Sequence, residues 1–229
     1  MNLRPLVPAQ SDAITATAPA PVVVAMLKAP RPGLVKTRLA RDVGPVTATA
    51  IYRRLVEHQL PAVPAPWALE IHFSPPEAAT EMRAWLGPRP TYVPQTGEDL
   101  GARLLAATAS AFARPAPAVI VIGGDCPGLD RATLQAAAEA LQSAEVVLGP
   151  AEDGGYYLIG LRRPQPTLFT HIAWSTSDVY AATMERIRAA GLSVVTLPVK
   201  ADVDDLTSWR QQEHLLAATA SAAPGKSRD

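Results

Sequence analysis

A short apolar run that ends in an acid constrains this sequence most. Residues Val119 to Ile122 are all β-branched, which is typical of a strand buried on both faces of a sheet. Two glycines end the run, Asp125 follows directly, and the segment Cys126-Pro127-Gly128 prevents the strand from continuing. Ligands of open α/β sheets bind at the carboxyl ends of the strands. We therefore expect Asp125 to lie in a binding site, where it would hold a metal ion against the phosphates of a nucleotide.

Apolar strand patterns alternate with helical patterns along the chain, which predicts an α/β fold with a mostly parallel sheet. The segment after residue 150 turns at once and returns, which predicts a hairpin within that sheet. We expect strands over residues 21–27, 67–73, 91–95, 119–122, 145–150, 156–161 and 191–198. We expect helices over residues 47–60, 76–86, 96–113, 131–143, from 174 onward, and 206–218.

Composition limits the functions open to the chain. Lys plus Arg and Asp plus Glu each number 21, which argues against a nucleic-acid binder with a broad basic face. The single cysteine excludes an intrachain disulfide and fits a reducing cytoplasm, and no apolar run is long enough to span a bilayer. Residues 1–20 are expected to be a disordered leader and 219–229 a flexible tail, which leaves one domain over 21–218.

A stiff basic loop follows the first expected strand. A solvated surface loop is the plainer interpretation of such a segment, but directly after a buried first strand we expect its cations to bind polyphosphate and its two prolines to fix its shape. A P-loop is disfavoured, because Val35 stands where glycine should precede Lys36 and because the prolines lack N–H groups that would cradle phosphate. The basic residues of the loop are Lys28, Arg31, Lys36 and Arg38.

Four further segments carry polar groups that are candidates for a site or for a helix cap or turn. Gln95, Gly97 and Arg103 are candidates to line a nucleotide pocket, although Thr96 or Gly97 can also cap the next helix and Arg103 can pair with Asp99. Asp153, before Gly154-Gly155, is suited to holding an acceptor hydroxyl or to closing an Asx-type turn. Ser175 or Thr176 is expected to cap the helix that begins near Trp174. In the run Asp202-Val-Asp-Asp205, capping explains Asp205 better than Asp202 or Asp204, for which a cation is the alternative.

Taken in order, these segments resemble a bacterial family of GT-A-fold transferases first described as a domain of unknown function and often labelled selenodomain-associated or arsenosugar-biosynthesis transferase. The ordered set is specific although each motif is weak, and Gly124 departs from it, since Ser or Thr is expected there. The matching motifs are Lys28-x-Pro-x-x-Gly33-x-Val-Lys36-Thr37-Arg38-Leu39, Gln95-x-Gly97-x-Asp-Leu-Gly-x-Arg103-Leu104, Gly124-Asp125-Cys-Pro127, Gly149-Pro-Ala-x-Asp153-Gly154-Gly155-Tyr156-Tyr-Leu-Ile-Gly-Leu161, Trp174-Ser175-Thr176 and Asp202-Val-Asp204.

The resemblance implies a single-domain GT-A fold, a three-layer α/β/α sandwich related to nucleotide-diphospho-sugar transferases. It implies a Mg²⁺ or Mn²⁺ ion held by Asp125 and Asp204, and a nucleotide or sugar-nucleotide donor that reacts with a small-molecule acceptor. The family label favours glycosyl transfer; the alternatives are nucleotidyl transfer with release of pyrophosphate, and a non-catalytic nucleotide-binding protein. Cys126 has no histidine beside it and is expected to pack rather than react.

Carried over residue by residue, the resemblance assigns three sets of residues. The catalytic set is Asp125, Asp153 and Lys36. The donor's nucleotide and phosphates are assigned to Lys28, Gly33, Lys36, Thr37, Arg38, Gln95, Gly97 and Arg103. The acceptor is assigned to Asp153, Gly154, Gly155, Tyr156, Trp174, Ser175 and Thr176.

Overall fold

The computed structural model describes residues 20–220, with side chains to residue 216. The expected leader lies outside the described residues except for Ala20, and so does the expected tail beyond Ala220. Seven strands form one sheet: β1 (Val22–Lys28), β2 (Ala68–Ser74), β3 (Thr91–Pro94), β4 (Val119–Ile122), β5 (Val146–Pro150), β6 (Tyr156–Leu161) and β7 (Val194–Thr196). The helices are α1 (Ala40–Val43), α2 (Pro45–Gln59), α3 (Ala79–Leu86), α4 (Leu100–Phe112), α5 (Arg131–Ala140), α6 (Val179–Ala189) and α7 (Leu206–Ala220), with 3₁₀ turns η1 (Leu60–Ala62), η2 (Pro76–Ala78) and η3 (Pro166–Leu168).

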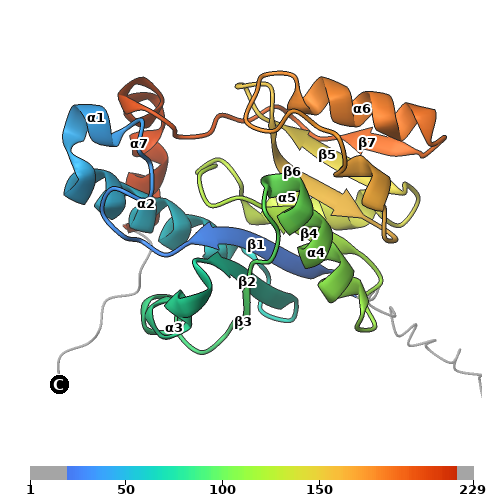
Figure 1. The fold of residues 1–229 in the computed structure, drawn as a ribbon, viewed down its shortest axis with the longest axis horizontal. Coiled ribbons are helices and arrows are strands. Elements are labelled where there is room, and N and C mark those ends of the chain that lie inside the picture. The colour runs from blue at the N-terminus through green and yellow to red at the C-terminus, as the bar shows by residue number, and fades with distance from the viewer. Residues whose placement is uncertain (1–19, 221–229) are drawn as a thin grey trace, which may run out of the picture.

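The strand order is β3-β2-β1-β4-β6-β5-β7, which confirms the mostly parallel sheet (Figure 1). β6 alone runs against its neighbours β4 and β5, because the tight turn after Pro150 leads β5 back into β6 as a hairpin. The remaining pairs are parallel, with Val22 opposite both Ala68 and Val119. β4 therefore lies between β1 and the hairpin, as expected for a strand apolar on both faces.

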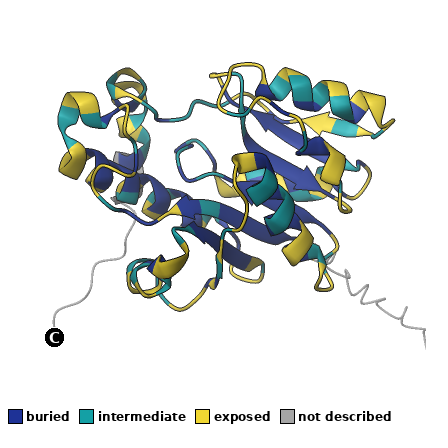
Figure 2. Cartoon of the chain, viewed as in Figure 1, coloured by how far each residue is buried: buried dark blue, intermediate teal, exposed yellow. Residues whose placement is uncertain are grey.

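Helices cover both faces of the sheet, which confirms the three-layer sandwich. On one face, side chains of α2, α3 and α5 pack on Leu27, Ile71 and Ile122. On the other face, α4 and α6 pack on alternate residues of the same strands, such as Val24 and Val121. Figure 2 shows the central strands buried between these layers. Each fully buried aliphatic side chain contributes about 1.5–3 kcal/mol, so the four buried residues of β4 anchor the loop that follows them.

A third cluster holds the C-terminal helix against the N-terminal half of the chain. Trp209 and Leu216 of α7 pack with Leu39 and with Ile51 and Leu55 of α2. Figure 1 shows α7 beside α1 and α2. This packing brings the segment before α7 next to the loop after β1, although more than 160 residues separate them, as the bond between Lys36 and Asp204 shows.

Two of the helix caps differ from the sequence expectation. α4 begins at Leu100 and is capped by Asp99, whose carboxylate accepts from the Ala102 N–H at 2.8 Å, so neither Thr96 nor Gly97 is the cap. α6 begins at Val179 and not near Trp174, since Ser175 has a φ of 64° and Thr176 Oγ1 donates to the Ala173 carbonyl. The expected caps Ser175 and Thr176 are therefore wrong, and the segment is a loop.

None of the helices in the described part of the chain is long and apolar enough to cross a membrane.

Candidate functional site

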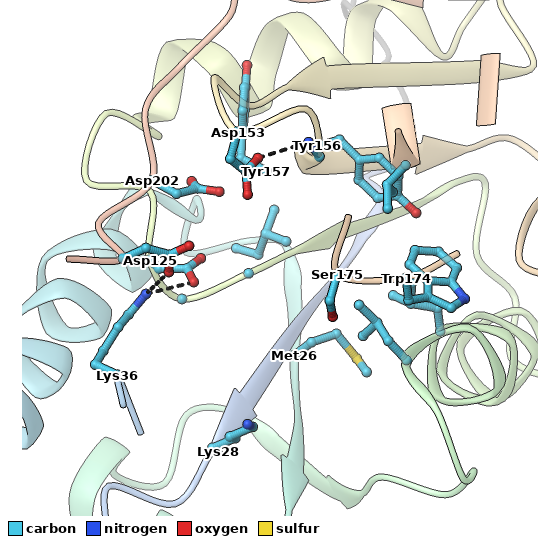
Figure 3. A pocket seen from close by; sticks show the side chains of 18 of the residues that line it. Met26, Lys28, Lys36, Asp125, Asp153, Tyr156, Tyr157, Trp174, Ser175 and Asp202 are labelled. Atoms are coloured by element: carbon cyan, nitrogen blue, oxygen red, sulfur yellow. Dashed lines mark hydrogen bonds and ion pairs between the residues drawn. The ribbon is translucent and has the colours of Figure 1, made fainter. Parts of the chain in front are cut away.

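A cavity of about 700 Å³ opens at the carboxyl ends of β1 and β4. It is lined by the ends of these strands, the basic loop after β1, the turn between β5 and β6, the loop 174–177 and the segment before α7, together with residues of α2, α4, α6 and β6. Figure 3 shows an acidic end, with Asp125, Asp202 and Lys36, and an aromatic end, with Trp174 and Tyr156. This is the edge at which open α/β sheets bind ligands.

Asp125 lies at the cavity because the chain turns immediately after β4. The Gln59 side chain donates to the Gly123 carbonyl at 2.7 Å, and the Val203 N–H donates to the Asp125 carbonyl at 2.9 Å. Gly124 is packed so closely that a Cβ would lie 2.5 Å from Leu27 Cδ2. Leu27 therefore fills the space that the side chain of a serine would need at position 124.

Lys36 joins the two acids that the resemblance assigns to a metal. Its Nζ donates to Asp125 Oδ2 at 2.9 Å and to Asp204 Oδ1 at 3.2 Å, and its side chain is only 6% exposed. Burial opposes its charge, but Asp125 and then Asp204 outweigh burial and hold the pKa of Lys36 above its ordinary value. The ammonium is therefore charged at neutral pH, and the cluster contains a cation of its own.

Asp202 is a member of this cluster that the sequence assignment of metal ligands omitted. It lines the cavity, its Oδ1 is buried, and that atom has no hydrogen-bond partner among the described residues. Burial and then the nearby Asp125 raise the pKa of Asp202 to about 8. The alternation of acidic and apolar residues in Asp202-Val203-Asp204 could have indicated this role. Val203 is buried, and the acids on its two sides both line the cavity.

The donor set fits a hard divalent cation. Asp125, Asp204 and Asp202 offer carboxylate oxygens, the ligands that Mg²⁺ and Mn²⁺ prefer. No group of three His, Cys, Asp or Glu side chains within the described residues is already arranged to hold a metal ion. Mg²⁺ is commonly bound through one or two carboxylates and completed by water and substrate phosphates. The residues therefore fit an ion that shares its ligands with a bound phosphate group.

The basic loop contributes its residues unequally. Lys28, Lys36, Thr37 and Arg38 line the cavity, and Arg38 Nη1 lies 3.5 Å from Asp204 Oδ2. Arg31 instead forms ion pairs with Glu77 and Glu81 at 3.1 and 2.9 Å, so the plainer surface interpretation holds for that residue. Gly33 lines neither cavity and shapes the loop with a φ of 83°.

A second cavity, of about 420 Å³, lies beside the first and shares Lys28 with it. It is lined by Gln95, Gly97 and Arg103, so the structure brings together the three residues expected around a nucleotide. Arg103 Nε donates to the Gly97 carbonyl at 3.1 Å. The alternative considered from the sequence was an ion pair between Arg103 and Asp99. Prolines 75 and 76 and Leu34, which is 57% exposed, supply apolar surface.

Gln95 holds this second cavity to the sheet. Its side-chain amide donates to the carbonyls of Leu27 at 3.1 Å and His72 at 2.7 Å, at the ends of β1 and β2. Both amide hydrogens are thereby used, so the orientation of the side chain is fixed.

The turn between β5 and β6 and the loop 174–177 form a wall of the first cavity that carries residues assigned to an acceptor. Asp153 Oδ1 accepts from the Gly155 N–H at 2.9 Å, which is the Asx-type turn, and the exposed carboxylate still lines the cavity. Gly155, Tyr156, Trp174, Ser175 and Thr176 line it as well, whereas Gly154 does not. Gly154 has a φ of 88° and a Cβ there would lie 2.1 Å from the Ser177 carbonyl oxygen, so it permits the two loops to meet.

The aromatic pair at this wall is fixed by packing. The rings of Tyr156 and Trp174 meet edge to face with centroids 6.5 Å apart. A Cβ on Gly101 would lie 2.4 Å from Trp174 Nε1, so α4 approaches Trp174 closely. This contact holds the loop 174–177 over the cavity.

Cys126 lies beside Asp125 but points into the core. It is 1% exposed, and burial, followed by Asp202 and Asp125, raises the pKa of its thiol. A buried neutral thiol is a poor nucleophile, which supports the expected packing role.

Solved structures share this architecture. A crystal structure of a candidate nucleotide-diphospho-sugar transferase from Desulfovibrio desulfuricans G20 is 33% identical, with a TM-score of 0.77 over 87% of this chain and 98% of that one. Rv0371C of Mycobacterium tuberculosis H37Rv, solved in complex with manganese, is 20% identical, with a TM-score of 0.52 over 84% and 98% of the two chains. The inositol-1-phosphate CTP transferase from T. maritima is 11% identical, with a TM-score of 0.57 over 90% and 100%. No curated protein matches the chain.

The fold is that of the nucleotide-diphospho-sugar transferases. Residues 61–176 match the family described as "Uncharacterized protein conserved in bacteria (DUF2064)". The chain belongs to this family.

Proposed function

We propose that this protein is a metal-dependent transferase that uses a nucleotide-activated donor. One observation carries the proposal: the acids Asp125 and Asp204 and the cation Lys36 form a single cluster at the end of β4, on a cavity that continues through Lys28 into a second one. A nucleotide requires this combination, because its phosphates need cations while its base needs a separate, partly apolar pocket.

The second cavity is assigned to the base of the donor, with Gln95, Gly97 and Arg103 at its polar edge. The phosphates are assigned to Lys28, Lys36 and Arg38, together with Thr37. Gly33 supports this loop rather than a ligand. Two neighbours support the assignment: Rv0371C was solved with manganese, and a CMP:2-keto-3-deoxy-manno-octonic acid synthetase with CTP.

Asp125 and Asp204 would hold the Mg²⁺ or Mn²⁺ ion, with Asp202 as a third oxygen donor beside them. When bound, such an ion neutralises charge on the phosphate leaving group. The residues of the chain orient the donor, since Lys36 and Arg38 fix the phosphates between the acidic end and the aromatic end of the cavity. Positioning and charge neutralisation together provide most of the catalysis that transfer of this kind needs.

The acceptor is assigned to the wall formed by Asp153, Tyr156, Trp174 and Ser175, with the backbone of Gly155 and the side chain of Thr176. The exposed Asp153 carboxylate accepts a hydrogen bond from an acceptor hydroxyl and orients its oxygen, and it can take up the proton as transfer proceeds. We favour glycosyl transfer, because a cavity lined by both an aromatic pair and the Asp153 carboxylate suits a sugar, with apolar contact on its face and hydrogen bonding at its edge.

Nucleotidyl transfer is the second candidate. Three cations of one loop line the cavity, which matches the charge of a nucleoside triphosphate, and the T. maritima neighbour is named as a CTP transferase. The two reactions leave different products: a nucleoside diphosphate in glycosyl transfer and pyrophosphate in nucleotidyl transfer.

The test is to incubate the protein with sugar nucleotides and with nucleoside triphosphates, with Mg²⁺ or Mn²⁺ and a panel of sugar and phosphorylated acceptors, and to identify the released product. Asp125→Asn should abolish turnover and leave the fold intact. Asp205→Asn is the matched control, because Asp205 belongs to the same acidic run but caps α7 through Ser208 at 2.8 Å, a role that Asn also fills. Turnover that survives Asp125→Asn, or is the same in chelator, would refute the proposal.

A further inference from the structure

Lys36 occupies the place between two carboxylates that a metal ion would need. Its ammonium donates to Asp125 at 2.9 Å and to Asp204 at 3.2 Å, and Figure 3 shows it pointing at Asp125 from the basic loop. Two cations that bind the same carboxylate oxygens repel each other, although water screens this repulsion in part, since the side chains of Asp125 and Asp204 are 37% and 40% exposed. A metal ion that takes Asp125 Oδ2 and Asp204 Oδ1, the two oxygens that the ammonium binds, must therefore displace it from at least one of them.

The chain retains lysine at a position whose backbone favours glycine. Lys36 has a φ of 46°, in the left-handed region, which costs a side-chain-bearing residue on the order of 1 kcal/mol. Without a cation, the carboxylates of Asp125 and Asp204 would lie close together with unbalanced negative charge. The ammonium removes much of this repulsion, which is a reason for lysine at this position even before a phosphate is considered.

We propose that Lys36 is a displaceable internal counter-cation. In the free protein it neutralises Asp125 and Asp204. When a divalent ion and the phosphates of the donor arrive together, its ammonium leaves at least one carboxylate and transfers to a phosphate oxygen. The proposal rests on the proposed function and adds that Lys36 competes with the metal ion in the free protein.

The reach of the side chain permits this exchange. Lysine carries a point charge on a flexible four-carbon stem, so the ammonium can move while the backbone stays in place. Lys28, Thr37 and Arg38 line the same cavity, so the phosphates would lie within the reach of the loop that carries Lys36. Metal and nucleotide then bind cooperatively, and by linkage each raises the affinity of the other by the same factor.

The test is a Mn²⁺ titration of the protein without nucleotide, with free Mn²⁺ measured by electron paramagnetic resonance. Lys36→Met should bind Mn²⁺ more tightly than the wild type, by a factor within the roughly 5–150-fold range of such couplings. Lys28→Met is the matched control, since it removes one positive charge from the same cavity, and no hydrogen bond or ion pair is observed between its side chain and these acids in the described structure. Its Mn²⁺ affinity should change far less than that of Lys36→Met.

Melting temperature gives a second readout that does not depend on activity. In chelator Lys36→Met should melt below the wild type, and Mn²⁺ should raise its melting temperature more than that of the wild type. If Lys36→Met does not fold, Lys36→Gln takes its place, because the amide still donates to a carboxylate without carrying charge.

An Mn²⁺ affinity of Lys36→Met that is equal to that of Lys28→Met, or weaker than that of the wild type, would overturn the proposal. If the wild type still binds nucleotide together with Mn²⁺ in that outcome, the proposed function is unaffected. If neither the wild type nor the variant binds Mn²⁺ or nucleoside diphosphates, alone or together, the proposed function and this inference both fail.

Discussion

Replacing Gly124 by serine tests how the loop after β4 is packed. A Cβ at this position would lie 2.5 Å from Leu27 Cδ2 and 2.9 Å from Val56 Cγ2, and both side chains are almost fully buried. Carbon atoms in contact are about 3.5–4.0 Å apart, so the added side chain overlaps Leu27 by roughly 1 Å or more. Overpacking of this kind costs about 1–3 kcal/mol, which lowers the melting temperature of a chain of this size by roughly 2–12 °C.

A double-mutant cycle separates this clash from other effects. Leu27→Val removes the Cδ2 atom at the cost of a small cavity, so the combination with Gly124→Ser should be less destabilised than the sum of the single variants by about 0.5–3 kcal/mol. The matched control is Gly128→Ser in the same loop, where the nearest atom to a Cβ is Lys200 Cδ at 3.7 Å. Thermal and urea unfolding are measured for the wild type, the two single variants, the double variant and the control. Additive effects, or a Gly124→Ser variant as stable as the control, would show that the reasoning is wrong.

Three further predictions concern the site. In chelator, the stability that protonated Asp202 contributes is full below its ordinary pKa of 3.8 and is lost as the pH rises through about 8. Urea unfolding of the wild type should therefore show a decline of about a few kcal/mol over this pH range, and Asp202→Asn should remove that decline. A pH profile that Asp202→Asn leaves unchanged would contradict the prediction. Cys126 should resist iodoacetamide at pH 8 until the chain unfolds, measured by mass spectrometry, and rapid labelling of native protein would contradict its burial. Arg103→Met should weaken nucleotide binding about 10–100-fold by calorimetry, the value of a charge-assisted hydrogen bond, and unchanged affinity would remove Arg103 from the base pocket.

The sequence predicted most of the architecture because the decisive patterns are local. The run Val119 to Ile122 matches β4 residue for residue, and the turn before Tyr156 correctly implied the hairpin. Both conclusions depend on periodicity and on turn chemistry, which neighbouring residues determine. The same holds for Asp125, since an acid after a buried strand lies at the sheet edge whatever the rest of the chain does.

The sequence was less informative where a contact between distant segments decides the structure. Ser175 and Thr176 have the right chemistry for a helix cap, but Trp174 packs against Gly101 of α4, and the loop continues to Asp178 before α6 begins. The contacts of Lys36 with Asp125 and Asp204 join residues 89 and 168 positions apart, through a packing of α7 on α2 that no local pattern indicates. The sequence named all three residues, but the bridge that Lys36 forms between the acids is visible only in the fold.

A calorimetric titration tests the central claim most directly. Nucleoside diphosphates, nucleoside triphosphates and sugar nucleotides are titrated into the wild type and into Asp125→Asn, each with Mg²⁺ or Mn²⁺ and again in chelator. The account predicts that at least one nucleotide binds the wild type much more tightly with the ion than without it, and that Asp125→Asn loses this difference. Equal binding with and without the ion, or a difference that survives Asp125→Asn, would contradict the account.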